Sequence, residues 1–287
     1  MRLVLVPKNG LANRIRAIEA GAAFCARNQC RFAVEWWREP DCNAEFAALF
    51  EPPSSFALRE RAFQAGRVGR FQRGLLKTAY LALGYRWIDD ADVLWWDHQA
   101  GRQALAPWRR IVADRRRLPT RCSRLVLRTH RAFAQPALGW TALQPRCELL
   151  AESRAVLSRA GAPPGAGHWI GVHIRRADHA AAKQHSPTVA FIDAIEWHLA
   201  ERPGALLFLA TDSPAEESAL RQRFGPRLVT AAKQHWQRST SDGVRAAMID
   251  LLCLSLCDVI LGSYWSSFSD VAARLGGTEL EVVRAAD

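Results

Sequence analysis

The residues best suited to chemistry lie together in residues 169–178 of this 287-residue chain, WIGVHIRRAD. Apolar residues dominate the first half, which predicts a buried strand. Side chains alternate along a strand, so we expect His173 and Arg175 on one face and Arg176 and Asp178 on the other. Two guanidinium groups at a strand end need anionic partners. We expect one to bind an external anion and the other to be held by Asp178, the alternative being a solvated surface salt bridge of little energetic value.

Two further predicted strands end in polar residues. Asp212 follows the apolar run 205–210, and a serine-rich turn containing Ser266 and Ser267 follows the run 258–261. The carboxyl ends of parallel strands meet at one edge of a sheet, where ligands bind, so we expect these side chains close to the first motif. The serine-rich turn also leads into a predicted helix, whose first N–H groups suit phosphate oxygens.

Asp250 is predicted to lie inside an apolar helix, residues 244–257. A carboxylate in apolar surroundings is costly unless it has a partner. Either Asp250 contacts an arginine of the site, or it accepts hydrogen bonds from a ligand such as guanine N1–H and N2–H. The residue pattern leaves both possibilities open.

A second candidate site lies near the start of the chain. Residues 2–6 predict a strand and residues 11–27 a helix, with Gly10, Asn13 and Arg14 where the two meet. Such a junction offers backbone N–H groups to an anion or to a sugar hydroxyl. The same side chains could instead cap the helix and cover its exposed face, and we weigh these two interpretations equally.

Strand and helix alternate after the Pro/Gly-rich break at residues 161–167. The predicted strands are 169–174, 205–210, 227–230, 258–261 and 279–283, and the predicted helices are 188–200, one from Pro214, 244–257 and one after Ser269. This alternation predicts a parallel, doubly wound sheet. We place a domain boundary at the break, giving domains 1–160 and 161–287.

Residues 37–150 have poor periodicity outside 74–83, and no topology follows from them. Their tryptophans are interleaved with arginines, a pattern that suits stacking on sugar rings, although core packing is the favoured interpretation for most of them. These tryptophans are Trp87, Trp95, Trp96, Trp108 and Trp140.

The chain is strongly basic, with a net charge of +11 and an isoelectric point of about 10.0, which indicates an anionic partner. Most of the excess lies in residues 59–131. The run 109–117 is a candidate for peripheral membrane contact or for an anionic acceptor, although a solvated helix face is the simpler interpretation. Nucleic acid is the least favoured partner because no recognition-helix, Arg/Gly-rich or zinc signature occurs.

Localisation follows from the same inventory of residues. The sequence has neither a membrane-spanning run nor a signal-peptide core, and its seven cysteines form no Cys-x-x-Cys pair. We therefore expect a reduced, cytoplasmic protein, with the inner membrane surface as a possible peripheral location.

The motifs together resemble those of the GDP-fucose-dependent α1,6-fucosyltransferases, a group that includes bacterial nodulation enzymes and, more distantly, the protein O-fucosyltransferases. The matching residues are Gly-Val-His173-Ile-Arg175-Arg176-x-Asp178, Leu-Ala-Thr211-Asp212, Ile249-Asp250 and Ser266-Ser267-Phe-Ser269. The match covers roughly residues 168–275, and Gly10–Arg14 is similar to the glycine/asparagine loop that begins the superfamily.

The resemblance implies an α/β, GT-B-like fold with two Rossmann-like domains, the C-terminal one binding the donor and the N-terminal one facing the acceptor. It implies inverting transfer of fucose from GDP-β-L-fucose to a hydroxyl of a glycan, oligosaccharide or lipid-linked, without metal or cofactor. A fixed guanidinium can offset the charge that develops on the leaving phosphate. The implied roles are β-phosphate binding for Arg175, guanine recognition for His173 and Asp250, support of the site for Arg176 and Asp178, and donor-pocket contacts for Asp212, Ser266 and Ser267.

One departure from the family concerns the general base. The α1,6-fucosyltransferases carry an acid shortly after the aspartate of the first motif, whereas residues 179–185 here, HAAAKQH, contain no carboxylate. Either His179 or His185 deprotonates the acceptor, or the transition state is dissociative enough to need little help. Transfer from another GDP-sugar is the main alternative function, since the motif residues are expected to contact the GDP part of the donor more than its fucose. A non-catalytic nucleotide-binding relative is the other.

Overall fold

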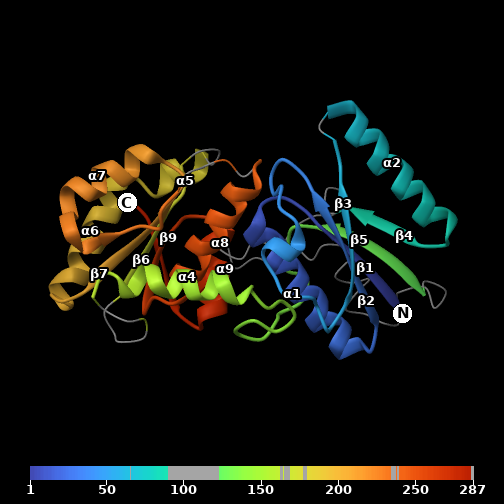
Figure 1. The fold of residues 1–287 in the computed structure, drawn as a ribbon, viewed down its shortest axis with the longest axis horizontal. Coiled ribbons are helices and arrows are strands. Elements are labelled where there is room, and N and C mark those ends of the chain that lie inside the picture. The colour runs from blue at the N-terminus through green and yellow to red at the C-terminus, as the bar shows by residue number, and fades with distance from the viewer. Residues whose placement is uncertain are drawn as a thin grey trace. The chain divides into compact units, whose positions relative to one another are not determined.

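The structure is a computed structural model, and it describes residues 1–64, 66–89, 123–161, 164, 169–176, 180–233, 237 and 239–285. The chain divides into two compact units, one of Met1–Gln144 with Arg238–Ser241 and one of Pro145–Gln237 with Asp242–Asp287. Each unit contains one five-stranded sheet in which every strand pair is parallel (Figure 1). The predicted α/β class with two parallel sheets is confirmed.

The first unit has the spatial strand order β3-β2-β1-β5-β4. Its centre is β1, whose residues Leu3, Val4, Leu5 and Val6 are buried on both faces, as expected of a strand inside a parallel sheet. The described elements are β1 (Arg2–Pro7), α1 (Leu11–Asn28), β2 (Arg31–Arg38), the 3-10 helix η1 (Phe46–Ala48), β3 (Ala57–Ala62), α2 (Gly66–Ala82), β4 (Arg86–Asp89) and β5 (Arg124–Thr129).

The second unit has the spatial order β10-β9-β6-β7-β8, with β6 at its centre. The chain runs outward from β6 through β7 to β8, then returns to the other side of β6 and runs outward through β9 to β10. This reversal creates a topological switch point between β6 and β9. The elements are α4 (Cys147–Ser158), β6 (Trp169–Ile174), α5 (Ala180–His185), α6 (Thr188–Glu201), β7 (Leu206–Thr211), α7 (Pro214–Phe224), the 3-10 helix η3 (Gly225–Arg227), β8 (Leu228–Val229), α8 (Ser241–Ser255), β9 (Val259–Ser263), α9 (Ser267–Gly276) and β10 (Glu279–Val283).

Helices cover both faces of the second sheet. Alternate residues of β6, among them Ile170 and Val172, share a core with α6 and α7. On the other face α8 comes so close that a Cβ atom on Gly171 would lie 3.0 Å from a Leu254 methyl carbon. Figure 1 shows α6 and α7 on one side of β6 and α8 and α9 on the other. His173, two residues after Gly171, therefore faces α8 and α9.

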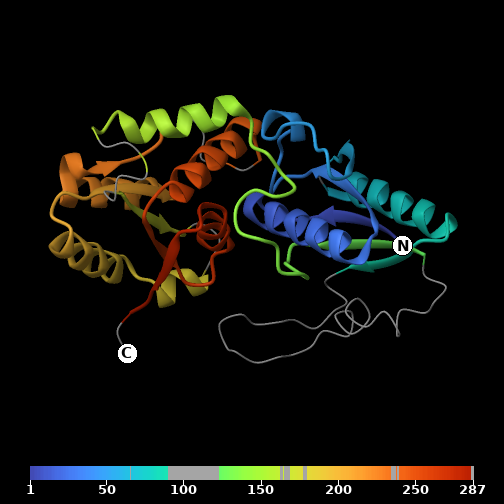
Figure 2. The ribbon, with the colours of Figure 1, turned by 90° about the horizontal axis from the view of Figure 1, so that it is seen from below.

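The structure moves the domain boundary that the sequence predicted at residues 160/161. Helix α4 belongs to the second unit, which begins at Pro145. The reason is packing against α8: the Cys253 thiol donates to the Ser153 carbonyl at 3.5 Å, and Arg245 pairs with Glu152. Figure 2 shows α4 running beside α8.

In its described part, the poorly periodic region contains β3, β4 and β5, which were not predicted, and α2, of which only the periodic stretch 74–83 was noted. The β3 sequence, ALRERA, is largely exposed and charged, so it lacks the alternation that predicts a strand. Trp87 stacks on Trp37 with ring centroids 6.5 Å apart, and Trp140 contacts Phe50, which confirms core packing for these two. The other three tryptophans of this region and the basic run 109–117 lie outside the described residues.

All six described cysteines are free thiols. Among the described helices, none combines the length and the apolar character that crossing a bilayer requires.

Candidate functional site

The candidate site lies at the carboxyl ends of β6 and β9, on either side of the switch point. The β6–β9 ladder ends at the pair His173–Gly262. Beyond it, the hydroxyl of Ser263 accepts a hydrogen bond from the Arg175 backbone N–H at 2.9 Å and donates to the His173 carbonyl at 3.1 Å. Ser263 thus joins the two strand ends and fixes the backbone from which the His173 and Arg175 side chains project.

Asp212, at the end of β7, positions the turn that follows β6. Its Oδ1 accepts from the Arg176 backbone N–H at 2.7 Å, and its Oδ2 lies 3.4 Å from Arg175 Nε. The Arg175 and Asp212 side chains are 19% and 24% exposed, so solvent reaches both. The Arg175 guanidinium is thus oriented by a carboxylate and accessible to solvent, and guanidinium groups recognise phosphate oxygens through charge-assisted hydrogen bonds.

His173 is a neutral imidazole inside the unit. It is 5% exposed and stacks on Phe268 of α9, with ring centroids 4.9 Å apart. Burial, with smaller contributions from the Arg175 and Lys233 charges, lowers the pKa of His173 to about 3. Among the described residues, no hydrogen-bond partner reaches its Nδ1. A buried ring nitrogen in this state is available to a ligand.

Asp250 pairs with Lys233 rather than with an arginine. Asp250 Oδ2 lies 2.7 Å from Lys233 Nζ, and both side chains are more than nine-tenths buried. Lys233 Nζ also donates to the Thr211 carbonyl at the end of β7, at 3.0 Å. Burial raises the pKa of Asp250 to about 6, against the opposing effect of Lys233. The other oxygen, Oδ1, has no hydrogen-bond partner in the described part of the chain.

Of the two alternatives that the sequence left open for Asp250, the contact with an arginine is not found among the described residues, and the cation that does pair with it, Lys233, was not predicted. This lysine lies in the irregular segment between β8 and α8, where no periodicity assigns it a direction. The sequence did carry one signal: a carboxylate in an apolar helix is costly without a partner. This cost indicates that a cation is needed but not which residue supplies it.

Arg176 belongs to the opposite face of β6 and supports the site from there. Its Nε donates to Glu216 Oε1 at 2.7 Å, and its Nη2 to Thr188 Oγ1 at 3.2 Å. The guanidinium also lies over the Phe191 ring, 6.0 Å from its centroid. Arg176 is thus held by Glu216 at the start of α7, a partner that was not predicted. Asp178 itself lies outside the described residues.

The serine-rich turn forms the start of α9 as predicted. Ser266 is the N-cap residue, and its hydroxyl accepts from the Phe268 backbone N–H at 3.3 Å. Ser267 is the first residue of α9 and is half-buried. The preceding residue, Trp265, is 54% exposed and has a positive φ of 56°, an uncommon conformation for a large side chain. The helix N-terminus is therefore set by a strained, tight turn directly after β9.

Of the two candidate bases, only His185 lies within the described residues. It is the last residue of α5 and is exposed, and its ring lies 4.7 Å from that of Tyr264, which directly follows β9. The neighbouring Ser186 fixes this contact, since its hydroxyl accepts from the Tyr264 N–H at 2.8 Å. His185 is therefore beside the β9–α9 turn. His179 lies outside the described residues.

In the candidate loop of the first unit, the structure contradicts part of the interpretation that these side chains cap the helix and cover its exposed face. Gly10 is the N-cap of α1 and makes no side-chain cap, while Asn13 accepts from Arg16 at 2.7 Å. Arg14 is fully buried: it donates to the carbonyls of Asn9 (2.8 Å) and Trp37 and lies over the Trp36 ring. The interpretation of Arg14 as part of an exposed helix face is wrong, because its guanidinium supplies donors to backbone carbonyls inside the unit.

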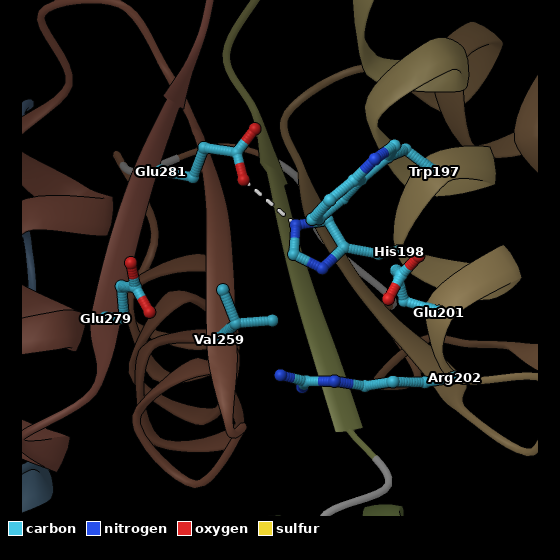
Figure 3. A pocket seen from close by; sticks show the side chains of 7 residues that line it. All are labelled: Trp197, His198, Glu201, Arg202, Val259, Glu279 and Glu281. Carbon is cyan, nitrogen blue, oxygen red and sulfur yellow. Dashed lines mark hydrogen bonds and ion pairs between the residues drawn. The ribbon is translucent and has the colours of Figure 1, made fainter.

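A cavity of about 330 Å³ in the second unit lies away from these residues (Figure 3). It is formed by the end of α6 and the beginnings of β9 and β10, the edge of the sheet opposite to the candidate site. Trp197, Arg202 and several glutamates line it, and His198 Nε2 lies 2.9 Å from Glu281 Oε2 there. The cavity includes none of the predicted site residues.

The site therefore brings His173, Arg175, Asp212 and Asp250 together at the switch point of a doubly wound sheet, in a chain with two such sheets. This is a GT-B-like arrangement with the properties of a nucleotide-binding site.

Comparison with known proteins identifies the fold more closely. No family model and no curated protein matches the sequence. Among solved structures, a NodZ α-1,6-fucosyltransferase co-crystallized with GDP is 17% identical, with a TM-score of 0.55 over 96% of this chain and 92% of that one. Apo POFUT1 is 11% identical, with a TM-score of 0.53 over 98% and 97%. A FUT1 mutant from Arabidopsis thaliana in complex with GDP is 14% identical, with a TM-score of 0.56 over 97% and 69%. The chain has the fold of the GDP-fucose fucosyltransferases, as its motifs indicated.

Proposed function

We propose that this chain is a glycosyltransferase that moves fucose from GDP-β-L-fucose to a hydroxyl of a glycan, with inversion at the transferred carbon and without a metal. The observation that carries the proposal is the switch-point edge of the second unit. There an oriented, accessible arginine lies beside two buried groups, His173 Nδ1 and Asp250 Oδ1, that lack partners among the described residues. Similar solved structures contain GDP or GDP-fucose.

The proposed donor contacts follow from these groups. The Asp250 carboxylate accepts from guanine N1–H and N2–H, and the neutral His173 ring contacts the same base. Arg175 binds the β-phosphate, and the N-terminus of α9, with Ser266 and Ser267, completes the phosphate side. Arg176 and Asp212 keep the turn after β6 in place.

In the proposed reaction the acceptor oxygen attacks the anomeric carbon of fucose from the face opposite to the phosphate. The bond between that carbon and the β-phosphate oxygen breaks, and its electron pair stays on GDP. Arg175 stabilises this developing charge, a task for which a preorganised cation is worth roughly 10²–10³ in rate. The acceptor proton goes to a base or to water, and His179 and His185 remain the predicted candidates.

Metal independence is the part of the proposal that rests most on Arg175. The sequence contains one Asp-x-Asp triplet, Asp90-Ala91-Asp92, a pattern in which two carboxylates could share a cation. It lies outside the described residues. A guanidinium at the β-phosphate makes a metal unnecessary for leaving-group stabilisation, and we therefore expect full activity in EDTA.

Calorimetric titration with GDP and with GMP, in EDTA, tests the donor site. We expect GDP to bind more tightly than GMP, and Arg175→Ala to weaken GDP binding about 100-fold while changing GMP binding little, because GMP has no β-phosphate. Arg202→Ala, which removes an exposed arginine at the opposite edge of the same sheet, is the matched control and should bind GDP like wild type. Absence of GDP binding, or equal binding of the two nucleotides, would refute the site.

Turnover then tests the sugar and the stereochemistry. Wild type should release GDP from GDP-fucose faster than from GDP-mannose, and NMR of the product should show the inverted anomer. Preference for another GDP-sugar would favour the alternative donor. Loss of turnover in EDTA, restored by Mg²⁺ or Mn²⁺, would overturn metal independence.

A further inference from the structure

Helix α2 of the first unit presents an outer face that the described part of the unit does not cover. Only two of its 17 residues, Gly69 and Tyr80, are buried. Figure 1 shows α2 along the outer side of its unit, beyond β3 and β4. A helix of this length that turns most of its surface to solvent is normally polar on that surface. This one is not.

An apolar stripe runs along the exposed face. Val68, Phe71 and Leu75 are 51%, 68% and 56% exposed, and their spacing of three and four residues places them on one side of the helix. Five of the ten exposed large hydrophobic residues of the described chain fall within residues 68–83, so the patch is a concentration and not scattered surface leucines. A groove of about 590 Å³ next to it is lined in part by Phe63, Leu76 and Ala79.

Cations flank the stripe, and α2 contains no acidic residue. Arg67, Arg70 and Lys77 are exposed, and the structure gives them no ion pair with any residue it describes. Arg67 lies next to the apolar stripe, and Arg70 and Lys77 lie farther round on the same side of the helix, about 130–150° from the centre of the stripe at 3.6 residues per turn. The fourth cation, Arg73, points back toward the sheet and pairs with Glu39 at 3.2 Å. The exposed face therefore combines apolar side chains with three uncompensated positive charges.

We propose that α2 docks this chain onto a membrane surface that contains anionic lipids. An amphipathic helix with cations beside an apolar stripe lies in the plane of such a surface, its apolar side chains entering the acyl boundary and its cations contacting the headgroups. A second copy of the chain would bring the same cations against one another, so self-association through this face is disfavoured. From the sequence, the basic central region was one candidate for membrane contact. Helix α2 is the part of that region to which we assign the contact.

Vesicle co-sedimentation with the full chain tests the proposal. We expect binding to vesicles of phosphatidylcholine with phosphatidylglycerol in equal parts, and weak binding to phosphatidylcholine alone. Binding should weaken as salt rises from about 0.05 to 0.5 M, because screening shortens the reach of the cations. Equal binding to both kinds of vesicle, or to neither, would overturn the proposal.

Variants separate the two contributions. The triple substitution Arg67→Gln, Arg70→Gln and Lys77→Gln should weaken binding to anionic vesicles about 100-fold, given the usual contribution of each cation near a charged membrane. Phe71→Ser with Leu75→Ser should weaken it at least about tenfold at unchanged net charge. These side chains are exposed, so thermal unfolding should occur at the wild-type temperature in both variants.

A matched control removes the same charge elsewhere. Arg154, Arg159 and Arg227 are exposed residues of the second unit, and the triple change to glutamine at these positions should leave vesicle binding at the wild-type level. An equal loss in this control would mean that net charge alone drives the binding, and would overturn the assignment to α2. So would concentration-dependent dimerisation of wild type that Phe71→Ser with Leu75→Ser abolishes. None of these readouts depends on glycosyl transfer, so this proposal and the proposed function fail independently.

Discussion

The two units have the same kind of parallel sheet but treat the charges at its carboxyl edge differently. In the first unit Asp89 accepts from Lys8 at 3.0 Å and from Arg128 at 2.9 Å, so the acidic group at that edge is paired through both of its oxygens, although buried nitrogens without a partner in the described part of the chain, Arg128 Nε among them, occur there as well. In the second unit His173 Nδ1 and Asp250 Oδ1 are buried and lack partners among the described residues. The unpaired atoms of the second edge include a carboxylate oxygen, and because a buried acceptor without a donor is costly, a ligand that supplies N–H groups would complete the structure there.

Two arginines make the same contrast. Arg14 in the first unit is fully buried and donates to backbone carbonyls, whereas Arg175 in the second is 19% exposed and oriented by Asp212. Arg14 donates hydrogen bonds to carbonyls inside the protein, whereas solvent reaches the guanidinium of Arg175. Residues of the same type beside a strand end can therefore serve folding or binding, and burial decides which.

The largest loss of stability should come from replacing Arg14. Arg14→Met leaves the carbonyls of Asn9 and Trp37 without their donor and deprives Glu39 of a cation, which should lower the free energy of unfolding by roughly 4 kcal/mol. Urea unfolding measures this loss. Arg27→Met, an exposed change on the same helix, should cost less than about 0.5 kcal/mol. A loss below about 1 kcal/mol for Arg14→Met would mean that the first unit does not depend on this arginine, and the contrast would fail.

The second-largest loss of stability should come from replacing Lys233. Lys233→Met leaves Asp250 buried without its cation, and we expect a loss of roughly 3 kcal/mol in the free energy of unfolding. Adding Asp250→Asn should recover part of that loss, because the buried charge is then absent. The double-mutant cycle gives the coupling between the two groups. Strictly additive effects would contradict a direct, buried ion pair.

The pH dependence of GDP binding sharpens the comparison further. The pKa of Asp250 is raised from 3.8 to about 6, mainly by burial, so this carboxyl takes up a proton as the pH falls below 6 and stops accepting from guanine. GDP affinity should fall about tenfold between pH 7 and pH 5. His173, with a pKa of about 3, stays neutral over this range.

Calorimetry at the two pH values, in wild type and Asp250→Asn, checks this expectation. The variant should bind GDP more weakly at pH 7 and show a nearly flat profile. The free energy of unfolding depends on pH in the opposite direction to GDP affinity. The native pKa of Asp250 lies above its unfolded value, so the contribution of this group to the free energy of unfolding decreases as the pH rises from about 4 to 6. A pH profile in the variant as steep as that of wild type would exclude Asp250 as the titrating group.

The smallest effect should come from the cap of α9. Ser266→Ala removes the oxygen that accepts from the Phe268 N–H and should cost about 1 kcal/mol of stability, whereas Ser266→Asp should keep the cap. If this helix N-terminus also receives phosphate, the aspartate should weaken GDP binding by charge repulsion while unfolding stays near wild type. Unchanged GDP affinity in Ser266→Asp would place the phosphates elsewhere.

The residue pattern alone predicts the parallel, doubly wound sheet of the second unit, and it names most of the side chains that the structure brings together at the candidate site. Strands 169–174 and 279–283 have the predicted bounds, because short apolar runs between turn signals have few alternatives in a parallel sheet. Alternation along β6 placed His173 and Arg175 on one face, and the strand ends predicted which polar residues share an edge.

The hydrogen-bond and ion-pair partners of these side chains could be seen only in the folded structure. Asp250 required a cation, but which one depended on the path of the segment before α8, and Lys233 supplies it. Arg14 donates to the Trp37 carbonyl, and Arg176 donates to the Glu216 carboxylate. Both contacts form only when separate elements of the chain pack together. In α2, periodicity could show an amphipathic pattern, whereas only packing revealed that the apolar side of Phe71 and Leu75 faces outward. Local patterns fix a side chain's direction relative to its own element, and the contacts between elements determine what that direction meets.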